Sequence, residues 1–389
     1  MIGPSHRWML PAAILFVGIN LRPSIAVIGP LLDTIQHSTG LSDSGSSLLT
    51  TLPVGLMGAV LFAIRPLRAA VRDKTAIATG LILLLFSHVV RFVLPSASIL
   101  LMTAVCGGIG IALVQAVMPA VIRRHAKSDA AGMMGLYSTA IMAGALISAM
   151  AGPWLAVTLN WRAALGIWVV PAAIALLIWR HALGPETVVH RVCDKPLHLY
   201  REPRAWLLLA FFGLSTGAYT LVLAWLPPFY TQMGWSAQRA GGLLAAVTVA
   251  EVIAGLAVSS AINRLPDRRP ALLMAIGALF LGMLGLAISP QTFAWQAAVS
   301  GGLGIGALFP LSIIVAMDHG DEPDEAAAIA AFVQGGGYVL AAVMPLVAGL
   351  LRQILADLSL AWWLMMLLCA VLGLIAIRLD PRRRIPNLT

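Results

Sequence analysis

The feature that most constrains this chain is a series of apolar blocks, each about 20 residues long, that recurs along its whole length. A block of that length matches a helix that crosses a hydrocarbon core of roughly 30 Å. The chain is 60% hydrophobic and 11% charged, whereas ordinary soluble domains carry roughly 25% charged residues. The sequence therefore predicts an all-α membrane protein.

Twelve transmembrane helices are expected, and an even number of crossings places both ends of the chain on one side of the membrane. The predicted spans are 8–32, 46–65, 75–94, 98–121, 132–157, 161–180, 205–229, 238–262, 270–289, 293–316, 326–350 and 360–378.

The basic residues predict the orientation of these spans. Of the 25 Lys and Arg residues, 20 lie in segments on the N-terminal side, four lie in segments on the other side, and Arg22 lies within a span. Cytoplasmic loops carry such an excess, so we expect a multi-pass protein of a bacterial inner membrane with both termini in the cytoplasm. Short basic clusters between apolar blocks do not form a nucleic-acid-binding face, and no nucleic-acid partner is expected.

A polar stretch at 181–204 predicts a cytoplasmic linker between an N-terminal six-helix half, 1–180, and a C-terminal half, 205–389. The halves repeat weakly in sequence. "GGIGIALVQAVMP" begins at 107 and "GGLGIGALFPLSI" at 301, and the stretch from Trp206 echoes that from Trp8. Two parallel repeats of this kind are typical of secondary transporters, whose substrate site lies between the halves near the bilayer midplane.

Five stretches resemble the major facilitator superfamily, and within it the cyanate porter branch. They are "GINLRPSIAVIGPLL" (18–32), "LLTTLPVGLMG" (48–58), "GGIGIALVQAVMPAVIRR" (107–124), "AWLPPFY" (224–230) and "DRRPALLMA" (267–275). The loop "IRPLRAAVRDK" (64–74) departs from the basic G-x-x-x-D-R-x-G-R-R marker of the superfamily. The resemblance implies the twelve-helix major facilitator fold, with the first and seventh helices lining a central cavity. The branch also includes relatives linked to nitroimidazole-type compounds.

Arg22 is the central candidate for substrate binding. A guanidinium within a span costs roughly 2.5–3.5 kcal/mol on insertion scales, and charges in such positions mark transport pathways by default. Its planar fork of donors suits a small anion. The alternative is a structural arginine that is satisfied by backbone carbonyls or a neighbouring helix. The repeat offset of 194–198 aligns Arg22 with residues 216–220, which include Tyr219 but no charge.

Glu251 is the second charge within a predicted span and is the candidate for proton coupling. A medium of low dielectric constant favours the neutral form of a carboxyl group, which would suit it to carry a proton. Alternatively, it is a fixed counter-ion of Arg22 or a permanently neutral, hydrogen-bonded acid.

Several uncharged polar residues within spans are further candidates, because unsatisfied donors are costly in the membrane interior. Each either lines the cavity or links helices together. Arg91, at the outer end of the third span, is expected to act as an interfacial or gate residue. The predicted substrate-binding residues besides Arg22 are Gln115, Tyr137, Ser215, Tyr219, Gln334 and Tyr338.

The predicted function is secondary active transport of a small cyanate-like anion by alternating access, with protons as a possible coupling ion. The alternative is an exporter of small heteroaromatic compounds, in which aromatic residues would dominate the site: Tyr137, Tyr219, Trp225, Phe309 and Tyr338. No metal-ligand spacing and no catalytic triad is found in the sequence, so we expect neither an enzyme nor a cofactor. We expect a monomer whose partners are the substrate and membrane lipid.

Overall fold

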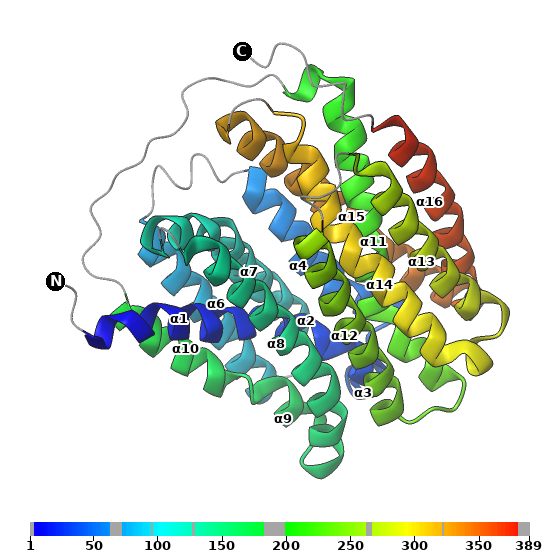
Figure 1. The fold of residues 1–389 in the computed structure, drawn as a ribbon. Coiled ribbons are helices and arrows are strands. Elements are labelled where there is room, and N and C mark those ends of the chain that lie inside the picture. Colours follow the sequence, from blue (N-terminus) through cyan, green and yellow to red (C-terminus); the bar gives the residue numbers. More distant parts are fainter. Residues whose placement is uncertain are drawn as a thin grey trace.

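The computed structural model describes residues 4–62, 72–94, 96–126, 129–182, 199–261, 267–320 and 323–379. Within these ranges the chain forms helices joined by turns (Figure 1). Twelve helical segments are long and apolar enough to cross a membrane. The predicted all-α membrane fold is confirmed.

Among the described residues, the chain up to Ala182 forms nine helices. The first predicted span, 8–32, runs through α1 and α2 into α3, and the sixth contains α9 and α10. The helices are α1 Pro4–Ile19, α2 Pro23–Ala26, α3 Ile28–Thr39, α4 Asp43–Phe62, α6 Asp73–Val93, α7 Ala97–Ala126, α8 Ala130–Thr158, α9 Trp161–Gly166 and α10 Val169–Ala182.

The last six spans are single helices, preceded by a short 3₁₀ turn. Most of the predicted linker, residues 183–198, lies outside the described residues. The elements are η2 Leu199–Arg201, α11 Pro203–Gln232, α12 Ala237–Ala261, α13 Arg269–Ile288, α14 Pro290–Met317, α15 Pro323–Leu355 and α16 Ser359–Arg378.

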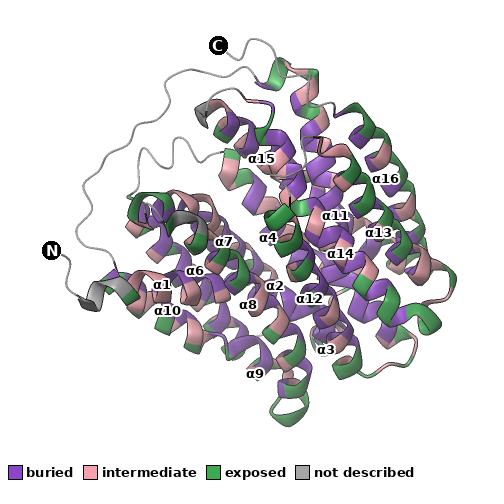
Figure 2. Ribbon diagram, in the orientation of Figure 1, coloured by how far each residue is buried: buried purple, intermediate pink, exposed green. Residues whose placement is uncertain are grey.

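Large apolar side chains cover the outer faces of the bundle. Figure 2 shows buried residues where helices face one another and exposed ones on the periphery. Phe86, Trp154, Leu281 and Leu367 are among the exposed apolar residues. An apolar surface of this extent is unusual for a soluble monomer, so these faces are suited to contact with lipid tails.

The most extensive helix contacts between the first six spans and the last six are those of α4 with α15 and of α8 with α12. Glycines allow both close approaches. A Cβ atom at Gly58 would lie 2.5 Å from the Gly335 carbonyl oxygen, and one at Gly241 would lie 2.5 Å from that of Ala149. Small residues at such crossings let backbones meet directly.

The first span departs from the single helix predicted over 8–32. Pro23 has no N–H group, so the Ile19 carbonyl loses the donor that a continuous helix would supply. Helix α1 ends at Ile19, and the chain resumes helical structure at Pro23. The break places Arg22 between two helices rather than on the side of one.

Candidate functional site

The break in the first span sets the position of Arg22. Asn20 and Leu21 donate their backbone N–H groups to the carbonyls three residues earlier, of Val17 and Gly18. This tightened last turn closes α1. Arg22 then occupies the N-cap position of α2, and its carbonyl accepts hydrogen bonds from Ile25 and Ala26.

Arg22 is buried, with 5% of its surface exposed. Its guanidinium makes no hydrogen bond or ion pair with any residue that the structure describes, and its Nε atom is buried without a partner. The guanidinium carbon lies 5.2 Å from the centre of the Tyr219 ring. Glu251 lies close enough for its charge to interact with the guanidinium, and Tyr137 and Tyr338 are also near it. The structure thus places Arg22 beside Tyr219, which lies in the stretch 216–220 that the repeat aligns with Arg22.

Several other polar atoms are buried without a partner. Native proteins leave few buried polar groups without a hydrogen bond, and each exception calls for an explanation such as a bound molecule. Thr216 was not among the predicted site residues, although it lies in the stretch aligned with Arg22. Within the described part of the chain, such atoms on spans one, four, five and seven include Asn20 Oδ1, Arg22 Nε, Gln115 Oε1, Tyr137 Oη, Thr216 Oγ1 and Tyr219 Oη.

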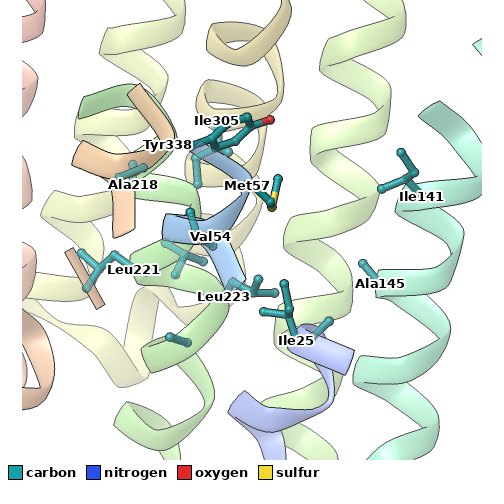
Figure 3. Close-up of a cluster of buried hydrophobic side chains, with 14 of the residues drawn as sticks. Ile25, Val54, Met57, Ile141, Ala145, Ala218, Leu221, Leu223, Ile305 and Tyr338 are labelled. Carbon is teal, nitrogen blue, oxygen red and sulfur yellow. The ribbon is translucent and has the colours of Figure 1, made fainter. Parts of the chain in front are cut away.

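Apolar side chains from both sets of spans pack near α2. Figure 3 shows Ile25 of α2, Val54 and Met57 of α4, and Leu223 of α11 within one buried cluster. Such surroundings exclude water and strengthen electrostatic interactions with a buried cation. An anion that reached Arg22 would therefore be held more strongly than one at the protein surface.

Glu251 lies on α12 and is also buried, with 7% exposed. Within the described part of the chain it forms no salt bridge with Arg22, although the two charges interact electrostatically. The backbone at Glu251 packs directly on Gly306 of α14, too closely for any side chain there. The carboxyl group is thus near the Arg22 charge without being locked to it.

The remaining predicted binding residues differ in their environments. The Ser215 hydroxyl donates to the Phe212 carbonyl at 2.9 Å and is therefore satisfied within α11. The Tyr338 ring packs edge-on against the Phe212 ring, with centroids 5.3 Å apart. The Phe309 ring lies 5.7 Å from the Phe212 ring. Gln334 is half-buried on α15.

Arg91 is almost completely buried, with 1% exposed, and its contacts are within the first six spans. Its Nε donates to the Thr103 hydroxyl at 2.9 Å, and its Nη1 donates to the Ser24 carbonyl at 2.8 Å. The predicted gate role stays a prediction.

A charged cluster that was not predicted from the sequence joins the first six spans to the last six. We call it the Arg352 cluster. Arg352 of α15 pairs with Asp33 of α3 at 3.0 Å and with Asp43 of α4 at 3.4 Å. The Thr231 hydroxyl of α11 donates to Asp33. The sequence signal was available, since Arg352 and Asp33 carry opposite charges just beyond the ends of spans that face the same predicted side.

The Arg352 cluster also includes Trp225. Its ring lies 5.5 Å from the guanidinium carbon of Arg352, and its Nε1 donates to the Pro345 carbonyl at 2.8 Å. Trp225 therefore belongs to this cluster, whereas the aromatic residues near Arg22 are Tyr137, Tyr219 and Tyr338.

Comparison with known proteins decides the family. The sequence profile of the Major Facilitator Superfamily matches residues 14–342. The chain belongs to this superfamily. It is 36% identical over 372 residues to the cyanate transport protein CynX of Escherichia coli K12, which covers 95% of this chain and 97% of the relative. It is 30% identical over 389 residues to the 2-nitroimidazole transporter of the same organism, covering 95% and 96%. The resemblance to the cyanate porter branch is confirmed.

Two solved transporter structures have a fold that is similar to this chain over almost its whole length. A D-xylose–proton symporter superposes with a TM-score of 0.76 at 14% identity, covering 95% of this chain and 97% of the symporter. A bacterial homologue of the human lysosomal transporter Spinster gives 0.73 at 16% identity, covering 97% of each. At such identities the likeness shows the fold alone, and the chain is a multi-pass membrane transporter of the superfamily type.

Proposed function

We propose that this protein is a secondary active transporter that moves a small cyanate-like anion across a bacterial inner membrane. The observation that carries the proposal is the buried Arg22 guanidinium, which has no hydrogen-bond or ion-pair partner among the described residues. A buried cation without a partner is strongly unfavourable. A bound anion would supply the missing charge.

The surrounding groups suit a small linear or planar anion. The guanidinium donates from a rigid fork and remains charged at any physiological pH. The Tyr137 and Tyr219 hydroxyls have no partner in the described structure, and each can donate to an anion or accept from a polar ligand. One anion between the guanidinium and the two hydroxyls would satisfy all three groups.

Glu251 is proposed to couple transport to protons. When its carboxyl group is ionised, its negative charge offsets the positive field of Arg22, with which it interacts electrostatically. When the group is protonated, the field of Arg22 is free to attract an anion. Proton and anion would then bind together and be carried in the same direction, as in a symporter.

Alternating access is proposed to operate between two six-helix halves, 1–180 and 205–389, with 181–204 as the cytoplasmic linker and both termini in the cytoplasm. In this orientation the Arg352 cluster lies on the outer side and closes it. The α4–α15 and α8–α12 crossings would allow the halves to rock. No chemical step is proposed, and a monomer suffices because the site draws residues from both halves of one chain.

Transport into proteoliposomes tests the proposal. Purified protein should take up radiolabelled cyanate above the background of protein-free liposomes, and Arg22→Ala should reduce uptake to that background. Arg239→Ala is the matched control, because Arg239 is exposed and stacks on Trp235 at 3.6 Å. Uptake by Arg22→Ala at the wild-type rate would contradict the anion-binding role.

A second candidate is export of small heteroaromatic compounds. It is favoured by the 30% identity to a 2-nitroimidazole transporter and by the contacts of Tyr338, Phe212 and Phe309. Competition separates the two functions. If the site binds anions, cyanate binds to the wild-type protein and displaces any bound 2-nitroimidazole. Arg22→Ala then abolishes both the binding of cyanate and the displacement. If the site binds heteroaromatics only, 2-nitroimidazole binding persists in Arg22→Ala and cyanate does not compete.

A further inference from the structure

The break in the first span is held by three neighbouring helices. On one side the Asn20 amide donates to the Phe16 carbonyl at 2.7 Å and to the Pro171 carbonyl of α10 at 3.0 Å. Gly144 of α8 lies against the Ile19 carbonyl, so closely that no Cβ atom could fit. On the other side Arg91 of α6 donates to the Ser24 carbonyl. Arg22 lies between these attachment points.

Arg91 is the most unusual of these attachments. It is a buried cation, and its hydrogen bonds within the described structure go to a hydroxyl and a backbone carbonyl rather than to a carboxylate. Burying a charge without an opposite charge beside it is energetically costly. Its presence here therefore calls for a functional reason. A neutral residue could fill the same volume without that cost.

The Arg91 side chain is itself fixed by the Thr103 hydroxyl. The Thr103 hydroxyl donates to the Leu100 carbonyl at 2.7 Å, which leaves its lone pairs to accept from Arg91 Nε. Ser87, one turn before Arg91, makes a separate bond: it donates to the Thr103 backbone carbonyl at 3.0 Å and joins α6 to α7 without using the hydroxyl that Arg91 contacts. The planar guanidinium then spans from α7 to the carbonyl of Ser24, two residues after Arg22.

We propose that Arg91 is a positioning residue that acts through Arg22. By binding Thr103 with one nitrogen and the Ser24 carbonyl with another, it holds α2 in place and so sets where the Arg22 guanidinium meets the substrate. The inference rests on the proposed function for the role of Arg22, but the attachment of α2 to Arg91 does not depend on the substrate. Misplacing a binding group by about 1 Å can cost up to 100-fold in function.

The first experiment measures the attachment without any ligand. Hydrogen–deuterium exchange of the full-length protein in detergent is followed by mass spectrometry for peptides covering residues 18–30. Arg91→Met removes both hydrogen bonds, and Thr103→Val removes one while keeping the side-chain shape. Both variants should exchange faster over 18–30 than the wild type. Ser87→Ala is the matched control, because Ser87 joins the same two helices without contacting α2, and its exchange there should be unchanged.

The second experiment measures binding of cyanate to the same purified variants by calorimetry. Arg91→Met should weaken binding by about tenfold or more, with a smaller loss in Thr103→Val and wild-type affinity in Ser87→Ala. Arg91→Lys tests whether the charge suffices. An ammonium keeps the charge but lacks the fork that reaches both partners, so this variant should bind more weakly than the wild type.

A double mutant separates positioning from direct attraction of the anion. If Arg91 acts through Arg22, the variant Arg22→Lys/Arg91→Met should bind no more weakly than Arg22→Lys alone, because coupled residues show non-additive losses. Additive losses, or wild-type cyanate affinity in Arg91→Met, would overturn the inference. Failure of the wild type to bind cyanate would instead contradict the proposed function and leave the exchange experiment to decide the role of Arg91. Equal exchange over 18–30 in Arg91→Met and wild type would then overturn the attachment.

Discussion

Removing the charge of Arg352 should open the side of the protein that the Arg352 cluster closes. The guanidinium of Arg352 is only 10% exposed, and it bridges α15 to both α3 and α4 through Asp33 and Asp43. Hydrogen bonds to charged groups contribute about 1.5–3 kcal/mol each. The two aspartates are 33% and 23% exposed, so solvent screening reduces each contribution to about 1 kcal/mol.

The two interactions together then favour the closed conformation by about 2 kcal/mol. A difference of 1.4 kcal/mol is a factor of ten in an equilibrium constant, so Arg352→Gln should shift the balance between conformations by about 30-fold toward opening on this side. Both interactions are lost in the open state, because they join the first six spans to the last six.

Cross-linking across the cluster measures the shift. The Ser44 backbone N–H donates to the Gln353 side chain at 3.3 Å, so cysteines placed at these two positions lie close together when this side is closed. In a variant whose native cysteines are replaced, a short thiol cross-linker should join Ser44→Cys and Gln353→Cys efficiently. Adding Arg352→Gln should markedly slow the reaction, whereas adding Arg239→Gln should not. An unchanged rate in a folded Arg352→Gln protein would refute the reasoning.

Three other substitutions test separate parts of the account. Glu251→Gln should transport cyanate at a rate independent of external pH in proteoliposomes; a pH profile like that of the wild type would exclude Glu251 as the proton carrier. Tyr219→Phe should weaken cyanate binding by about fivefold, because one hydrogen bond contributes about 1 kcal/mol. Tyr219→Ala should weaken it further, because the ring near Arg22 is also lost. Calorimetry would contradict a hydroxyl contact if the Tyr219→Phe protein bound cyanate as tightly as the wild type. Gly58→Ala should lower the melting temperature, since its Cβ would meet the Gly335 carbonyl. Gly373→Ala on α16 should not, because a Cβ there has no neighbour within 4 Å. Equal melting temperatures for the two variants would mean that α4 and α15 can move apart freely at their crossing.

The sequence was sufficient to predict the twelve spans, because hydrocarbon thickness constrains helix length and apolar blocks of that length are visible directly. It was also sufficient to select Arg22, since a charge within such a block is rare. The repeat alignment matched Arg22 with the stretch that contains Tyr219, and the ring lies beside the guanidinium.

The break of the first span was harder to predict. Pro23 is compatible with either a kink or a break, and the outcome depends on partners from distant helices, such as Gly144 and Arg91. The Arg352 cluster depends on four helices, α3, α4, α11 and α15, meeting at one end of the molecule. Asp33 lies in α3 and Asp43 begins α4, and both fall outside the predicted apolar spans. Hydrophobic periodicity therefore says nothing about their partners, and only the packed structure shows which charges meet.

The most direct test of the central claim is calorimetric titration of cyanate into the purified wild-type protein and into Arg22→Ala. The account predicts saturable binding to the wild type and to Arg239→Ala, and no measurable binding to Arg22→Ala at the same concentrations. Equal cyanate affinity in Arg22→Ala and the wild type would show that the buried guanidinium is not the anion site.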